Sequence, residues 1–281
     1  MSTQCGTLYL VGTPIGNLED VTLRAVRVLR DVDAIAAEDT RVTRRLTKRH
    51  DIGTPLISYH QHSGKKRADE ILGMLRDGKD VALVCDAGMP GFSDPGVRLV
   101  AACVAEGIPV VVVPGPTAAS AALAVSGFSG REHLFVGFLP TKRGERRKAL
   151  ARVADQRGAL VFYEAPHRLL ASLREMREVL GDRQAACARE LTKRFEEVVR
   201  GSLSELVEHL LQVQPRGEFT VVVEGAAGEA EVDLTGAVAE VEELMDAGLS
   251  RSRAVAHVAS HRGVPRSGLY RAVVQGPEEK S

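Results

Sequence analysis

The sequence predicts an α/β protein in which two α/β domains are followed by a small C-terminal helical domain. In the first half, short apolar runs alternate with amphipathic stretches, a pattern typical of parallel strands joined by crossover helices. The alternation begins again near Phe128 with a different strand spacing, and the last part of the chain shows helical periodicity only. We therefore expect an N-terminal α/β domain (1–127), a C-terminal α/β domain (128–225), a linker (226–235) and a helix-turn-helix-like domain (236–281).

The elements of the first domain follow from its apolar runs and spacings. The runs predict strands at Leu8–Val11, Ala34–Ala37, Val81–Cys85 and Val110–Val113, the last of them buried. Apolar residues at helical spacing predict helices at Leu18–Leu29, Lys65–Leu75, Val97–Glu106 and Thr117–Ala124. Gly78 and Gly107 stand where helix-ending glycines are expected, and Thr117 is placed to cap the helix that it begins.

The second domain and the tail continue in the same way. Strands are predicted in the segments HLFVGFLP, ALVFYEAP, QAACARELT and EFTVVVEG, and helices at Arg168–Val179 and Leu203–Leu211. The small and acidic segment Gly225–Asp233 is typical of a linker. Beyond it we expect a helix at Ala237–Asp246, then a helix, a turn at Gly263–Pro265 and a last helix, which resembles a helix-turn-helix module.

The composition bounds the class of protein. A chain of 281 residues buries sizeable cores without disulfides. Its 37 basic and 37 acidic residues exclude a uniformly basic surface, so any contact with RNA must use local basic patches. No segment reaches the roughly 18 apolar residues of a membrane span, and no signal peptide is recognisable, so we expect a cytoplasmic protein. The scattered cysteines predict reduced thiols and no metal site: Cys5, Cys85, Cys103 and Cys187.

Three glycine- or proline-rich segments follow predicted strands. VGTPIGNLED (11–20) lacks the dinucleotide and P-loop signatures, so a tight turn explains it as well as a binding loop. CDAGMPGFSDPG (85–96) favours a binding loop over a structured surface loop, because so many glycines permit close approach of a ligand. In PGPTAASAAL (114–123), Thr117 caps a helix, and the small residues leave room for a ligand at its start.

Charged segments add candidate contacts. AEDTR (37–41) has two interpretations, a helix cap with Arg41 in a surface ion pair or a carboxylate lining a substrate cleft. The runs 41–50 and 142–148 each contain five Lys or Arg. Such runs are solvated faces in most proteins, but two of them on a neutral chain favour a phosphate-binding patch.

Taken together, these segments resemble the 16S ribosomal RNA (cytidine-2′-O)-methyltransferase family of the tetrapyrrole methylase-like superfamily. The resemblance spans residues 8–225 and is carried by LYLVGTPIGNLEDVTLRA, AEDTRVTRRL, SYHQH, CDAGMPGFSDPG, VPGPTAASAAL, FYEAPHRL, ARELTKRFEE and GEFTVVVEG, while SGLYRAVV is similar to the family's small helical domain. It implies a cofactor cleft between the two α/β domains, S-adenosylmethionine as methyl donor, and a homodimer. It also implies a decoding-centre cytidine of 16S rRNA in the small ribosomal subunit as target. Met89 and Phe92 depart from the family's usual residues.

The resemblance also implies site residues. The cofactor contacts expected by analogy are Pro14, Asp86, Ala87, Gly88, Met89, Thr117, Ala118, Tyr163, Ala188 and Phe219. On the acceptor side, our hypothesis is that Asp39 acts as base or ribose anchor and that Arg41 holds a phosphate. The RNA contacts expected in the two basic runs are Arg44, Arg45, Lys142, Arg143, Arg146, Arg147 and Lys148.

Two rival functions remain at this point. A methyltransferase acting on a tetrapyrrole ring carbon has the same superfamily fold but little use for two basic runs. A nucleic-acid-binding regulator would use the segment Ser250–Val274, with its four arginines Arg251, Arg253, Arg262 and Arg266, but would not need two glycine-rich loops at strand ends.

Overall fold

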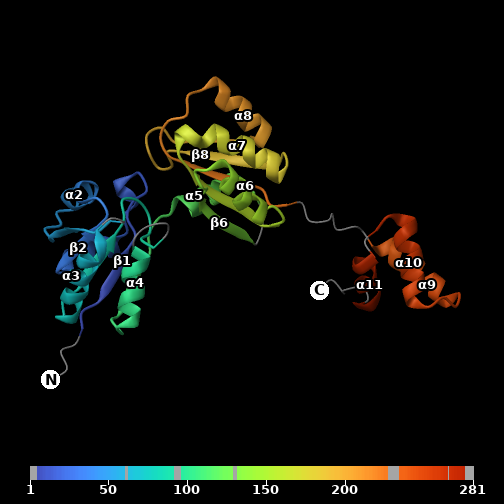
Figure 1. The fold of residues 1–281 in the computed structure, drawn as a ribbon, viewed down its shortest axis with the longest axis horizontal. Helices are drawn as coiled ribbons and strands as arrows, with labels where there is room; N and C mark the ends of the chain where they lie inside the picture. Colours follow the sequence, from blue (N-terminus) through green and yellow to red (C-terminus); the bar gives the residue numbers. More distant parts are fainter. Residues whose placement is uncertain are drawn as a thin grey trace. The chain divides into compact units, whose positions relative to one another are not determined.

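The computed structural model describes residues 5–60, 63–91, 96–128, 132–226, 234–264 and 266–275. The chain divides into two compact units, Met1–Ala226 and Ala227–Ser281. The first unit contains two five-stranded sheets with their helices, and the second contains helices (Figure 1). The predicted fold class, two α/β domains with a small helical domain, is confirmed. No helix in the described ranges is long and apolar enough to cross a membrane.

The first sheet is entirely parallel and has the order β3-β2-β4-β1-β5. Its strands are β1 (Leu8–Val11), β2 (Ala34–Ala37), β3 (Leu56–Ser58), β4 (Val81–Val84) and β5 (Val110–Val113). The helices that connect them are α1 (Leu23–Asp31), α2 (Thr40–Arg49), α3 (Gly64–Arg76) and α4 (Gly96–Ala105). The central strands are buried on both faces, which explains their continuous apolar runs.

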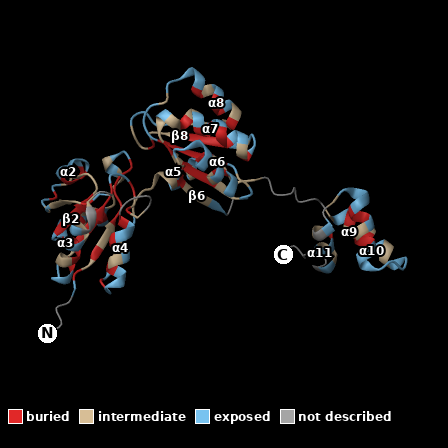
Figure 2. Cartoon of the chain, in the orientation of Figure 1, coloured by how far each residue is buried: buried red, intermediate tan, exposed pale blue. Residues whose placement is uncertain are grey.

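Alternate residues of the strands serve two separate cores, as the pleat of a strand requires. Leu8 packs with Ile71 of α3 and Leu99 of α4 on one face of the sheet. Val11 packs with Leu29 of α1 and Leu46 of α2 on the other face. Figure 2 shows buried residues concentrated along the strands and exposed residues on the outer sides of the helices.

The second sheet is mixed, with the order β6-β7-β10-β8-β9. Its strands are β6 (His133–Phe138), β7 (Ala159–Glu164), β8 (Gln184–Arg189), β9 (Glu197–Ser202) and β10 (Phe219–Val223). Only β6 and β7 pair in parallel, and the other three pairs are antiparallel. One face packs against α6 (Arg143–Arg152), α7 (Pro166–Leu180) and α8 (Leu203–Gln212).

Helix α5 (Ala118–Ser126) covers the opposite face of the second sheet, although it directly follows β5 of the first (Figure 1). Ala122 of α5 packs with Val161, Ala186 and Val222 of the sheet. At the other end of the helix, Arg200 of β9 donates through Nε to the carbonyl of Ser126 at 3.3 Å. The predicted division after residue 127 therefore falls at the end of a helix that packs on the second sheet.

Several elements differ from their prediction. The helix expected at Leu18–Leu29 is broken, because Asn17 caps a short 3₁₀ turn at Leu18–Asp20 and Thr22 then caps α1. Strand β5 was expected to be buried, but it is an edge strand, and Val112 is 53% exposed. The capping role of Thr117 is confirmed, since its hydroxyl accepts from Ser120 N at 3.2 Å. The elements β3, α6 and β9 were not predicted, and α2 was expected only in the interpretation of AEDTR as a helix cap.

The second unit contains α9 (Thr235–Asp246), α10 (Arg251–Arg262) and α11 (Arg266–Gln275). Its core joins Val241 of α9 with Val255 and Val258 of α10 and Leu269 of α11. Gly263 ends α10 in the left-handed conformation with φ 66°. The predicted helix, turn and helix are thus present. Pro265 and most of the predicted linker (227–233) lie outside the described residues, as do residues 92–95 of the second glycine-rich loop.

Candidate functional site

Loops after the neighbouring strands β4, β1 and β5 meet at one edge of the first sheet, because parallel strands all end there. Thr13 and Gly88 fasten two of these loops together: Thr13 N donates to Gly88 O at 2.8 Å, and Gly88 N donates to Thr13 O at 3.1 Å. The Thr13 hydroxyl also donates to the carbonyl of Cys85 at 3.1 Å. The two glycine-rich loops found in the sequence therefore form one structure.

Glycine is required at two points of this structure. A Cβ atom on Gly12 would lie 2.7 Å from Gly115 Cα and 2.7 Å from Met89 Sδ, closer than real contacts allow. Gly88 has φ +82°, a conformation that side-chain-bearing residues rarely adopt. Gly12 thus allows the loops to approach each other closely, and Gly88 allows its loop to take the shape that it has.

The loops border a cavity of about 820 Å³, a volume within the range of about 300–1,000 Å³ typical of small-molecule sites. The loops and the start of α5 form one wall, and strands β6, β7, β8 and β10 of the second sheet contribute the other. Alanines at 118, 119, 124 and 188 keep the space open. The cavity is therefore lined by residues far apart in the sequence.

Three aromatic side chains gather on the second-sheet side of the cavity. The rings of Phe135 and Tyr163 meet edge to face with centroids 5.0 Å apart, and Phe138 lies 5.5 Å from Tyr163. Burial raises the pKa of Tyr163, which a hydrogen bond with the Ala119 backbone partly opposes, so its phenol stays neutral near pH 7. This apolar, partly flat wall suits a planar ring system.

The structure brings most of the predicted cofactor residues to this cavity. Those that line it are Ala87, Gly88, Met89, Thr117, Ala118, Tyr163, Ala188 and Phe219. Pro14 is buried and does not line the cavity, although its neighbour Ile15 does. Asp86 is exposed beside it and accepts from Asp39 N at 2.9 Å. Partial withdrawal from solvent raises the pKa of Asp86, which the hydrogen bond from Asp39 N partly opposes.

Asp39 is the N-cap of α2, as one interpretation of AEDTR expected. Its Oδ1 accepts from Arg41 N at 2.8 Å, and its Oδ2 accepts from Arg41 Nη2 at 2.7 Å. The hydrogen bonds from Arg41 lower the pKa of Asp39 to about 2. A carboxylate held in this way is a weak base near neutral pH. The hypothesis that Asp39 acts as base or ribose anchor stays a prediction, and in this structure its carboxylate is engaged by Arg41. Arg41 is 85% exposed and remains accessible to a phosphate.

Glu38, the residue before Asp39, is the carboxylate that lines the cavity on this side. Asp86 N donates to Glu38 Oε2 at 3.5 Å, so the side chain is turned toward the second glycine-rich loop. Glu38 was not among the site residues expected from the sequence, although it adjoins Asp39 in AEDTR.

The first basic run forms the exposed face of α2. Thr43, Leu46 and Thr47 point inward and are buried. The exposed basic positions are Arg41, Arg44, Arg45, Lys48 and Arg49. Arg44 and Arg45 form no ion pair within the described ranges. Because Asp39 caps this helix and Glu38 precedes the cap, the basic face begins beside the cavity.

The second basic run lies on α6 and is only partly available. Arg146 is buried and paired with Glu175 of α7, so the prediction that it contacts RNA is wrong. Arg147 is paired with Glu178. Lys142 pairs with Glu145 at 3.4 Å and Arg143 with Glu175 at 3.6 Å, yet these two side chains remain 80% and 71% exposed, and Lys148 is also exposed. Three of the five predicted contacts in this run are therefore largely exposed cations.

Other lining residues gave no sequence signal. Phe135 and Phe138 come from a strand that reads as ordinary core, and Leu191 and Gly217 come from loops of the second sheet. Glu164 also lines the cavity, but its carboxylate is engaged by Ala165 N at 2.9 Å and by the Ser172 hydroxyl at 2.5 Å. We therefore assign Glu164 a structural role.

Comparisons with known proteins agree with this geometry. A family model described as tetrapyrrole (corrin/porphyrin) methylases matches residues 7–207. Ribosomal RNA small subunit methyltransferase I of Halalkalibacterium halodurans is 44% identical over 270 residues, which cover 94% of this chain and 93% of that protein. The protein of the same name from Thermotoga maritima is 50% identical over 220 residues, which cover 78% of this chain and 99% of that protein.

Solved structures share the fold at lower identity. A cobalt precorrin-4 methyltransferase aligns with a TM-score of 0.61 at 18% identity, covering 78% of this chain and 94% of that one. Uroporphyrin-III C-methyltransferase from Thermus thermophilus, in complex with S-adenosylhomocysteine, aligns with a TM-score of 0.57 at 23% identity, covering 78% and 97%.

Proposed function

The chain belongs to the tetrapyrrole methylase family, and we propose that within this family it methylates ribosomal RNA of the small subunit. It is an S-adenosylmethionine-dependent methyltransferase. Relatives named ribosomal RNA small subunit methyltransferase I match it at 44–50% identity, whereas the tetrapyrrole enzymes resemble it only in fold. Within that activity, we propose the ribose 2′-hydroxyl of a decoding-centre cytidine of 16S rRNA as the acceptor. Such an enzyme works in the cytoplasm, where the subunits are.

The cavity suits S-adenosylmethionine by its shape and its chemistry. The aromatic wall of Phe135, Phe138 and Tyr163 suits the adenine, and the alanines at the start of α5 leave room for the chain of the methionine. Asp86 stands beside the cavity as a carboxylate for a hydroxyl or an amine. The cofactor has no phosphate, so the lack of a P-loop lysine is consistent with it. When bound, it supplies an activated methyl group.

The protein's own contribution is to align the acceptor and to receive its proton. Orientation of reacting groups can supply about 7–11 kcal/mol of the barrier. Glu38 is the carboxylate at the cavity edge that is not used as a helix cap, and we assign it the role of positioning the ribose hydroxyl and accepting its proton. Such a base typically adds about 10²–10⁴-fold in rate.

The RNA backbone is expected to run along the basic face of α2. Arg41, Arg44 and Arg45 begin at the cavity edge, and guanidinium groups bind phosphate through paired hydrogen bonds. The exposed cations of α6 provide a second contact, limited to Lys142, Arg143 and Lys148.

A homodimer is the proposed state in solution. Val97 and Val104 on α4 are 55% and 66% exposed, and Val112 on the neighbouring edge strand β5 is 53% exposed. Apolar side chains gathered on neighbouring elements are typical of a surface that is covered by another protein. A second copy of the chain is the simplest partner for it.

The proposal is tested by transfer of labelled methyl groups to small ribosomal subunits that lack this methylation. Label on one cytidine ribose, mapped by nuclease digestion, is the expected result. Binding of the cofactor without any label on the subunits would keep the methyltransferase class and overturn the proposed acceptor. Labelling of a tetrapyrrole would favour the rival assignment.

A further inference from the structure

The second unit separates its charges onto different helices. Helix α9 carries four acidic residues and no basic one: Glu240, Glu242, Glu243 and Asp246. Helices α10 and α11 carry five arginines and no acidic residue: Arg251, Arg253, Arg262, Arg266 and Arg271. Although the formal net charge of the whole chain is zero, these two helices therefore form a strongly basic pair.

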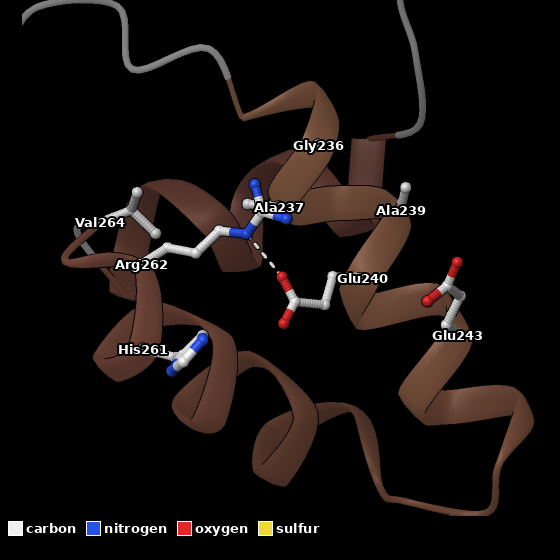
Figure 3. A pocket seen from close by; sticks show the side chains of 8 residues that line it. All are labelled: Gly236, Ala237, Ala239, Glu240, Glu243, His261, Arg262 and Val264. Carbon is white, nitrogen blue, oxygen red and sulfur yellow. Dashed lines mark hydrogen bonds and ion pairs between the residues drawn. The ribbon is translucent and has the colours of Figure 1, made fainter.

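The contacts within the unit distinguish engaged arginines from available ones. Arg262 is turned toward α9 and pairs with Glu240 at 2.5 Å, as Figure 3 shows. The hollow of about 720 Å³ beside this pair also has Glu243 in its lining, so it does not suit an anion. Arg266 donates to the Ser252 hydroxyl at 3.2 Å, which brings the beginnings of α10 and α11 together.

The remaining arginines face solvent without a carboxylate partner. Arg251, Arg253 and Arg271 are exposed, and none of them forms an ion pair within the described ranges. Tyr270 is 45% exposed and stands one helical turn after Arg266. Arg253 lies two residues from Val255, and Arg271 lies two residues from Leu269, so each arginine is on the side of its helix opposite a fully buried core residue. Each helix thus presents an exposed cation on its outer side, and α11 adds one accessible aromatic ring.

We propose that the outer faces of α10 and α11 form a docking surface for the sugar-phosphate backbone of structured RNA. The inference rests on the proposed function, since it assigns to the second unit a grip on the ribosomal RNA that the first unit methylates. Arginines bind phosphates by paired hydrogen bonds, and an exposed tyrosine can stack on an unpaired base. Among the residues of the unit that the structure describes, the exposed large apolar side chains are few, which disfavours a membrane: Leu249, Tyr270 and Val274.

The role is capture of the substrate rather than chemistry. The Thermotoga maritima relative is matched over 99% of its length by 220 residues, which is close to the length of the first unit alone. Loss of the docking surface is therefore expected to weaken binding of the subunit and to leave cofactor binding intact.

The test compares two charge reversals of equal size in the full-length protein. Arg253→Glu with Arg271→Glu changes the proposed surface, and Arg24→Glu with Arg27→Glu changes two exposed arginines of α1 as the control. Binding to purified small subunits is measured by filter retention across a salt series. Thermal melting establishes that each variant is folded, and Arg253→Gln with Arg271→Gln replaces the first pair if it is not.

We expect the surface variant to bind subunits about tenfold more weakly at 0.15 M salt. The plot of log K against log salt should become shallower, its negative slope decreasing in magnitude by about two, one for each lost phosphate contact. If the surface variant binds subunits as tightly as the control variant does, the proposal is overturned. This holds even if the surface variant has lost affinity for anionic vesicles, which would assign the surface to a membrane. Failure of the proposed function is separate, because the unchanged protein would then bind subunits without methylating them.

Discussion

Arg146 and Glu175 form a two-pronged ion pair inside the second α/β domain. Arg146 Nε lies 2.7 Å from Glu175 Oε2 and Nη2 lies 2.8 Å from Oε1, while the side chains are only 8% and 7% exposed. The same guanidinium donates to Thr141 O at 3.0 Å. A residue from a run of cations, expected to contact RNA, instead joins α6 to α7.

Glu175→Gln is predicted to lower the free energy of unfolding by about 3–5 kcal/mol, because it leaves a buried guanidinium without its counter-charge. Glu178→Gln, in the exposed pair with Arg147, should cost at most about 1 kcal/mol and serves as control. Urea unfolding at pH 7 measures the free energy of unfolding of both variants.

The stabilisation by this pair depends on pH, because the hydrogen bond from Arg146 lowers the pKa of Glu175. The stabilisation is present above the ordinary pKa of a glutamate and is lost as the pH falls through the lowered pKa of Glu175. Equal costs for the two variants would contradict the buried pair.

Arg41→Gln is predicted to raise the pKa of Asp39 from about 2 toward its ordinary value of 3.8. The reason is that the side chain of Arg41 supplies the largest contribution to the lowered pKa, while the backbone hydrogen bond of the cap remains. The change is followed by NMR titration of the Asp39 carboxyl group between pH 1.5 and about 6, a range that brackets ordinary carboxyl pKa values. An unchanged midpoint would show that the pair is not formed in solution.

Glu38→Gln is predicted to reduce turnover on small subunits about 10²-fold with cofactor affinity unchanged, because it removes the proposed proton acceptor. Asp39→Asn should reduce it less than tenfold, since asparagine caps a helix as well as aspartate. Single-turnover methylation and calorimetry of cofactor binding separate the two effects. A larger loss for Asp39→Asn than for Glu38→Gln would instead assign the catalytic role to Asp39.

Ala118→Leu is predicted to weaken cofactor binding at least about tenfold. Ala118 lines the cavity at the start of α5, and three added carbons would occupy space that the ligand needs. Ala101→Leu adds the same volume on the exposed side of α4 and should bind the cofactor normally. Calorimetric titration of both variants decides the point, and equal affinities would place the cofactor elsewhere.

Thiol labelling is predicted to be fast at one cysteine and slow at the other three. Cys5 is exposed, whereas Cys85, Cys103 and Cys187 are buried. Burial raises the pKa of Cys103 to about 11 and that of Cys187 to about 12, which removes the reactive thiolate near neutral pH. Counting modified thiols at pH 7.5 before and after denaturation tests this. Rapid labelling of Cys103 or Cys187 in the folded protein would contradict the packing around them.

The sequence predicted best where local rules suffice. Strands such as Leu8–Val11 and Ala34–Ala37 were placed correctly because their apolar runs are continuous and their limits are marked by glycine or charge. Helix α2 was left open as one of two interpretations of AEDTR, because its sequence, TRVTRRLTKR, contains only two large apolar residues and its charge pattern conceals its helical spacing. Exposure of Val112 could not be predicted, since it depends on strand order, which sequence spacing does not contain.

The candidate site shows the same limit. Loop residues such as Gly88 and Thr117 were identified from local composition and from the resemblance, and the structure brings them to one cavity. Phe135 and Phe138 were missed because a phenylalanine in a strand has no local mark that separates a core residue from a cavity wall. The choice between Glu38 and Asp39, and the burial of Arg146, depend on tertiary contacts that become visible only in the fold.

Helix α5 connects the edge of the cavity to the outer strand β9 and is short and stiff. Its nine residues span about 14 Å at 1.5 Å per residue. Thr117 at one end borders the cavity, while the carbonyl of Ser126 at the other is held by Arg200 of β9. Because a hydrogen-bonded helix of this length barely compresses, displacement of the outer strand is transmitted to the cavity edge.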